Sequence, residues 1–140
     1  MLRRTHFAIV VFFILLFLSM IEQKFVFITT ALIATLFPDL DLNLKFFVKH
    51  RGIFHSFIFL SLITFFFVLF LPVVAFPLFL GYGLHLFADS FTLMGIQPFY
   101  PFRGKSSGKI RTGGKVDLLL FLCFLIGDLC LLVWHFISII

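Results

Sequence analysis

Histidine and aspartate side chains recur at short spacings in an otherwise apolar chain. "PDLD" at 38–41 places two carboxylates two residues apart, "HRGIFHS" at 50–56 holds two imidazoles, and "HLFAD" at 85–89 places His and Asp at i and i+4. A further histidine stands near the amino terminus. Mixed imidazole and carboxylate donors suit zinc or manganese, and this number of donors would serve one or two divalent ions. The candidate metal ligands are His6, Asp39, Asp41, His50, His55, His85 and Asp89.

Such a set of donors indicates metal-assisted hydrolysis. A bound divalent ion lowers the pKa of a coordinated water to about 7 and stabilises charge on a substrate oxygen. We expect Asp41 to be a ligand or, alternatively, the general base. Arg51 is a candidate to clamp a phosphate, although it could equally neutralise a carboxylate or act as an ordinary basic anchor.

The elements that must position these residues are transmembrane helices. Hydrophobic residues make up 62% of the 140 residues, 25 residues are phenylalanine, only 12% are charged, and the mean hydropathy is +1.22. Lipid offers the backbone no hydrogen-bond partners, and a chain this short cannot close a barrel. We therefore predict an all-α, polytopic transmembrane bundle of about five helices in one membrane domain, 1–140. The expected helices are 6–21, 24–37, 54–71, 77–94 and 117–140, with connectors at 38–53 and 95–116.

The distribution of basic residues predicts the orientation. If the amino terminus is cytoplasmic, every lysine and arginine except Lys24 falls on the cytoplasmic side. The connectors 38–53 and 95–116 then share that side, and all the candidate ligands converge there. We expect a multi-pass protein of the cell membrane with its site facing the cytoplasm. Ionisable residues inside a span are costly and mark functional sites by default.

The motifs together resemble a known family. "LFPDLD", "HRGIFHS" and "GYGLHLFADSFTLMGIQPFYPF" are similar, in order and spacing, to the YdjM-type membrane-bound metal-dependent hydrolases. The resemblance implies a metal centre similar to those of zinc-dependent phospholipase C and P1-type nucleases, and so phosphoester chemistry. Phe54 stands where family members often have threonine. The late segment "IRTGGKVD" adds Asp117 as a candidate extra ligand.

These observations favour a membrane-embedded hydrolase that uses one or two divalent ions, zinc first and manganese second. A site at the membrane edge suits a phospholipid or a lipid-linked phosphoester, so the expected partners are membrane lipids. No nucleic-acid partner is expected, because the basic residues are not interleaved with aromatics on a soluble surface. The alternative is a non-enzymatic metal-binding membrane protein, either a transporter or a scaffold. Transport would need polar groups through both leaflets, and the outer halves of the predicted helices offer few.

Several of these residues also have a purely structural interpretation. His6 could be an interfacial anchor, and His85 with Asp89 could be an ion pair within the bundle. Asp128, near mid-bilayer, could be a hydrogen-bond partner that orients His85, or it could be a protonated carboxyl group in hydrocarbon. The "GKS" in the last connector is not a phosphate-binding loop, because the required upstream glycine is Phe99. We expect a flexible basic connector there, which could also fold over the site as a lid.

Overall fold

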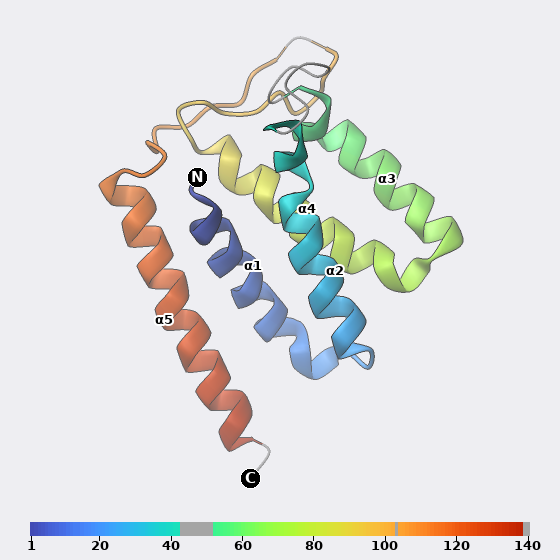
Figure 1. Ribbon diagram of the computed structural model, residues 1–140, viewed down its shortest axis with the longest axis vertical. Helices are drawn as coiled ribbons and strands as arrows, with labels where there is room; N and C mark the ends of the chain where they lie inside the picture. The colour runs from blue at the N-terminus through green and yellow to red at the C-terminus, as the bar shows by residue number, and fades with distance from the viewer. Residues whose placement is uncertain (43–51, 103, 139–140) are drawn as a thin grey trace.

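The computed structural model describes residues 1–42, 52–102 and 104–138 (Figure 1). Within these ranges the chain is helical and contains no named strand, with isolated bridges at Thr92–Ile110 and Ile96–Ser106. The five α-helices confirm the predicted fold class. They are α1 (Arg3–Phe17), α2 (Lys24–Leu36), α3 (Phe57–Phe70), α4 (Pro72–Ser90) and α5 (Lys115–Ile137), and the 3-10 turns are η1 (Leu18–Met20), η2 (Pro38–Leu42) and η3 (Ile53–His55).

Among the described residues, three segments are long and apolar enough to cross a membrane: Arg3–Met20, Pro72–Ser90 and Lys115–Ile137. The helices α2 and α3 are shorter, with 13 and 14 residues. At 1.5 Å per residue each rises about 20 Å, which is less than the hydrocarbon thickness of about 30 Å. The chain nevertheless reverses direction at each turn, so successive helices run up and down the bundle (Figure 1).

The observed helix bounds differ from the expected ones where proline and capping groups act. α4 begins at Pro72, five residues before the expected start, because proline is tolerated in the first turn of a helix, where its missing N–H has no helical partner. α3 begins at Phe57 because the Ser56 hydroxyl caps it, accepting a hydrogen bond of 3.1 Å from the Phe59 N–H. His55 therefore lies in the preceding turn η3, whereas the expected helix 54–71 would have placed it in the first helical turn, so that placement is wrong.

α4 lies at the centre of the bundle and packs against α1, α2 and α3. Its contact with α2 is close, because a Cβ on Gly81 would lie 2.1 Å from the carbonyl oxygen of Ala31. Tyr82 and Leu86 on α4 are buried together with Leu60 of α3. These contacts fix the height of α4 against its neighbours, and so the height of the polar residues in its last turns.

α5 packs along α1 and is held to it at both ends. Near its start the Thr5 hydroxyl donates to the Asp117 carboxylate at 2.7 Å. Near its end His135 Nε2 lies 2.8 Å from the carbonyl oxygen of Leu15. The rings of Phe12 and Phe124 meet edge to face between these points. The two helices therefore have a defined register.

The amino terminus, η2, η3 and the connector from α4 to α5 lie at one end of the bundle, and the carboxyl terminus lies at the other (Figure 1). Lys24 begins α2 at the end opposite the amino terminus. The described basic residues at the amino-terminal end are Arg3, Arg4, Lys105, Lys109, Arg111 and Lys115. The division of basic residues predicted from the sequence thus matches the two ends of the bundle, with Lys24 at one end and the other described basic residues at the opposite end.

Backbone hydrogen bonds hold the connector after α4 in a defined conformation. The Leu93 N–H donates to the Ile110 carbonyl at 2.9 Å, and Ile96 and Ser106 exchange backbone hydrogen bonds of 2.8 and 2.9 Å. Gly95 has a φ of +62°, and a Cβ there would lie 2.1 Å from the Ser106 carbonyl oxygen. Its two described arms are therefore hydrogen-bonded to each other, which differs from the flexible connector expected from the sequence.

Candidate metal centre

His6 is carried into the interior by the anchored start of α1. The Asp117 carboxylate accepts hydrogen bonds from the Leu2 N–H at 3.1 Å, the Thr5 hydroxyl at 2.7 Å and the Gly113 N–H at 2.7 Å. These bonds tie the first turn of α1 to the start of α5. The His6 ring, on the next residue of α1, is only 3% exposed.

His85 and Asp89 come from the last two turns of α4. Their i and i+4 spacing places both on one helix face, where they are 1% and 2% exposed. The helix ends just beyond them, because the Thr92 hydroxyl donates to the Asp89 carbonyl at 2.8 Å and accepts from the Gly95 N–H at 3.2 Å. The cluster therefore sits at the end of the helix.

His55 reaches the same place from η3. This turn is fixed on α4 because the Tyr82 hydroxyl donates to the Phe54 carbonyl. It is also fixed to the last connector, since the Phe57 N–H donates to the Pro98 carbonyl at 2.8 Å. His55 is fully buried. Phe54 stacks edge to face with Phe37 and Phe59, so its side chain fills apolar space.

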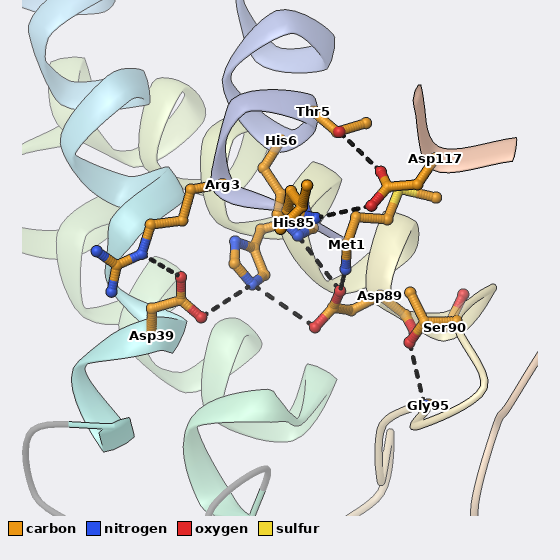
Figure 2. A network of polar contacts seen from close by, with 12 residues as sticks. Met1, Arg3, Thr5, His6, Asp39, His85, Asp89, Ser90, Gly95 and Asp117 are labelled. Carbon is orange, nitrogen blue, oxygen red and sulfur yellow. Dashed lines mark hydrogen bonds and ion pairs between the residues drawn. The ribbon is translucent and has the colours of Figure 1, made fainter. Parts of the chain in front are cut away.

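The donors converge on the Asp89 carboxylate (Figure 2). Asp89 Oδ1 lies 3.3 Å from His6 Nε2, while Asp89 Oδ2 lies 3.8 Å from His55 Nε2 and 3.9 Å from His85 Nε2. Asp39 Oδ1, from η2, lies 3.8 Å from His85 Nε2. Two donors that are each about 2 Å from one ion can be at most about 4 Å apart. All four separations meet this condition.

The donors form two overlapping groups. One contains His6, His85 and Asp89, the other contains Asp39, His55 and His85, and within each group the ligand atoms lie within 4.8 Å of one another. His85 belongs to both. The two Asp89 oxygens face different histidines, an arrangement in which one carboxylate can serve both groups.

The hydrogen bonding of the imidazoles fits a cation. Among the described residues, the buried atom His85 Nε2, which faces both carboxylates, has no hydrogen-bond partner. A buried polar atom left without a partner costs about 1–3 kcal/mol. The carboxylate oxygens nearest His85 Nε2, at 3.8 and 3.9 Å, are too far for a hydrogen bond but suitably placed to share an ion with it. The residues present therefore fit a divalent metal.

The structure brings together five of the predicted ligands, which are His6, Asp39, His55, His85 and Asp89. Asp41 lies on η2, but its side chain is outside the described part of the chain, as are His50 and Arg51. The roles predicted for those three residues, and the ligand and catalytic roles in general, stay predictions.

Two polar contacts around the cluster were not anticipated. Arg3 Nε lies 3.4 Å from Asp39 Oδ2, and the amino group of Met1 lies on Asp89 Oδ1. Arg3 stands three residues before His6, a spacing that puts both on one face of α1 and could have indicated the contact. Asp117 belongs to neither group of candidate ligands, since its described contacts are the three hydrogen bonds that anchor α1.

Asp128 is buried on α5 at 6% exposure, and its Oδ1 atom has no hydrogen-bond partner in the part of the chain that the structure describes. The α5 helix packs on α1. The described ring and ion-pair partners of His85 are His6, His55, Asp39 and Asp89, so nothing supports a role for Asp128 in orienting His85.

Fold and site together define a helical membrane protein with a His/Asp cluster, capable of holding a metal ion, at one end of its bundle. The family model described as YdjM inner membrane protein matches residues 1–139. The chain belongs to this family. Comparisons with curated proteins and with solved structures gave no match.

Proposed function

We propose that this protein is a metal-dependent hydrolase of the cell membrane that cleaves a phosphoester at the cytoplasmic face. The observation that carries the proposal is the position of His85 Nε2. It lies between an Asp39 oxygen and an Asp89 oxygen, at 3.8 and 3.9 Å, with two further buried imidazoles beside it. A purely structural His–Asp pair would be expected to close to hydrogen-bond distance.

His6, His85 and Asp89 would hold one ion. Because an imidazole nitrogen has one lone pair, His85 would serve a single ion, and Asp39 and His55 would complete that ion's coordination or help to hold a second. Zinc is the proposed metal and manganese the alternative, because the donors mix imidazole with carboxylate. When bound, a divalent ion supplies Lewis acidity towards a phosphoryl oxygen and acidifies water. Asp41 remains our proposed base or additional ligand.

The Asp39 side of the cluster is the accessible side. The Asp39 side chain is 17% exposed, against 3% or less for His6, His85 and Asp89, and the Arg3 side chain beside it is 63% exposed. Arg3, Asp39, His6 and His85, among others, line a small depression between them that leaves no room for a water molecule, so a substrate would have to move side chains on entering. The Arg3 guanidinium is therefore placed to bind an anionic phosphate at the rim and to orient it towards the histidines. We propose the same role for Arg51.

The one-sided position of the cluster supports an enzyme over a transporter. Its donors come from the start of α1, from η2 and η3, and from the end of α4, all at the amino-terminal end of the bundle (Figure 1). The basic residues at that end support a cytoplasmic location. A phosphate group near the membrane surface would reach such a site while its lipid tails stayed in the bilayer.

The test combines metal analysis with turnover. The full chain, purified in detergent and loaded with zinc or manganese, is assayed against bis-p-nitrophenyl phosphate and fluorescent phospholipids. We expect turnover that disappears in Asp89→Asn and His85→Ala and persists in His135→Gln, which changes a histidine at the opposite end. Stoichiometric metal without turnover on any phosphoester would contradict the hydrolase and favour a metal-binding scaffold.

A further inference from the structure

An apolar slot adjoins the metal cluster. It has a volume of about 360 Å³ and is lined by α1, α4, α5 and Ile110 of the last connector. α1 packs against both α4 and α5, so it forms the floor of the slot. Every lining side chain is apolar. The volume falls within the range of about 300–1,000 Å³ that is typical of ligand pockets.

The slot runs parallel to the helices. Each helix contributes residues four apart in sequence, which lie one above the other on a helix face and about 6 Å apart along the axis. These pairs are Ile9 and Phe13, Leu84 and Ala88, and Leu120 and Phe124. The lining therefore extends along the helix axes, which is also the direction of lipid chains in a leaflet.

One end of the slot meets the cluster. Met1 lines the slot, and its amino group contacts Asp89. Ala88, which also lines it, directly precedes Asp89 on α4. A molecule held in the slot would thus place one end beside the candidate metal centre and the other in the hydrocarbon.

The same end carries positive charge. The Arg4 guanidinium lies 5.1 Å from the centre of the Phe121 ring, next to Leu120. Arg111 follows Ile110 in the connector, and Lys115 begins α5. These charges would attract an anionic head group at the mouth of an apolar channel.

The dimensions favour a chain over a helix from another protein. One turn of a helix about 10 Å across and 5.4 Å long occupies about 420 Å³, which is more than the slot holds. An extended hydrocarbon chain is much thinner. We propose that this slot binds one acyl chain of an anionic diacyl phospholipid, with the phosphate at the basic mouth beside Asp89.

This inference names the lipid class and the part of the lipid that is recognised. That the bound lipid is also the substrate rests on the proposed function. Binding itself requires no metal. It can therefore be tested in the presence of a chelator, so that failure of hydrolysis and failure of chain binding are separate results.

The experiment uses the full chain in phosphatidylglycerol vesicles that contain a trace of phosphatidylglycerol with a diazirine on one acyl chain. After illumination in EDTA, labelled sites are mapped by mass spectrometry. We expect labels concentrated at 9–13 and 120–124. Leu120→Trp fills the slot and should lose most of this labelling. Leu119→Trp, the same change at a neighbouring position that is 60% exposed, should keep it.

Thermal unfolding shows whether Leu120→Trp folds. If it does not fold, Leu84→Phe, which fills the slot from α4, replaces it and should lose the same labelling. Labels spread evenly over the exposed faces of α3 and α5 would mean ordinary surrounding lipid and would overturn the proposal. Equal labelling of Leu119→Trp and a folded slot-filling variant would also overturn it. A folded Leu120→Trp that binds zinc normally but has lost its labels supports a chain site separate from the metal site.

Discussion

The imidazole rings of His6 and His85 stack with their centroids 4.0 Å apart and their planes 9° apart. The stack brings the imidazole groups of two helices together beside the Asp89 carboxylate. The contact also joins α1 to α4 at the cluster.

His85 should be more important for metal binding than any other histidine, because it belongs to both groups of donors. We expect His85→Ala to lose nearly all bound zinc, with affinity weakened about 100-fold or more. His6→Ala and His55→Ala each remove a donor from one group and should retain part of the metal. The ratio of zinc to protein after dialysis, measured by plasma mass spectrometry, checks this order. Equal losses in all three variants would argue against a shared ligand.

Asp117 should behave as a structural residue. Asp117→Asn weakens the anchor of α1, since a neutral amide cannot accept the three described hydrogen bonds as well as a carboxylate does. We expect a loss of about 1–3 kcal/mol of unfolding free energy with zinc binding preserved in the folded fraction. Asp128→Asn is the matched control and should be nearly neutral. If Asp117→Asn abolished zinc binding without destabilising the fold, Asp117 would be a ligand after all.

Gly81 and Gly83 offer a paired test of the helix packing. A Cβ at Gly81 would collide with the α2 backbone at 2.1 Å, whereas at Gly83 it would make an ordinary contact of 3.5 Å with Leu60 Cδ2. We expect Gly81→Ala to destabilise the protein by about 1–3 kcal/mol and Gly83→Ala to leave it unchanged or slightly more stable. Thermal unfolding in detergent compares the two. Equal melting temperatures would contradict the close approach of α2 and α4.

Arg3 should be more important for activity than for stability. Its ion pair with Asp39 is mostly solvent-exposed, so Arg3→Ala should change the unfolding free energy by less than about 1 kcal/mol. We expect a rise in KM for anionic phosphoesters if Arg3 binds the phosphate. Arg3→Lys keeps the charge without the planar guanidinium and should recover only part of the affinity. An unchanged KM in Arg3→Ala would remove Arg3 from the proposed site.

The orientation is testable with reporter fusions. We expect the amino terminus in the cytoplasm and five passes through the membrane. A reporter enzyme fused after Ile140 should then report the non-cytoplasmic side. A fusion within 104–114 should report the cytoplasm. A cytoplasmic carboxyl terminus would mean that one of the short helices, α2 or α3, does not cross.

The sequence predicts most of the fold and a good part of the site. Hydropathy identifies the helices because lipid leaves few alternatives, and the i and i+4 spacing by itself places His85 and Asp89 on one helix face. Ser56 caps α3 and so leaves His55 in η3. This helix start depends on a side-chain hydrogen bond, which a hydropathy pattern does not predict. The hydrogen bond between Thr5 and Asp117 joins residues 112 apart, and no local pattern encodes it.

The cluster also constrains the order of assembly in the membrane. Its donors lie on α1, η2, η3 and α4, and the contact between Met1 and Asp89 spans 88 positions of the chain. Non-local contacts of this kind form late, because a long loop must close first. During synthesis α1 would therefore be in the bilayer before α4 is inserted, and until then His6 would lack its neighbours on α4. The candidate site would then be complete once α4 has packed, because none of its described donors lies on α5, so an ion could bind before the last helix is in place.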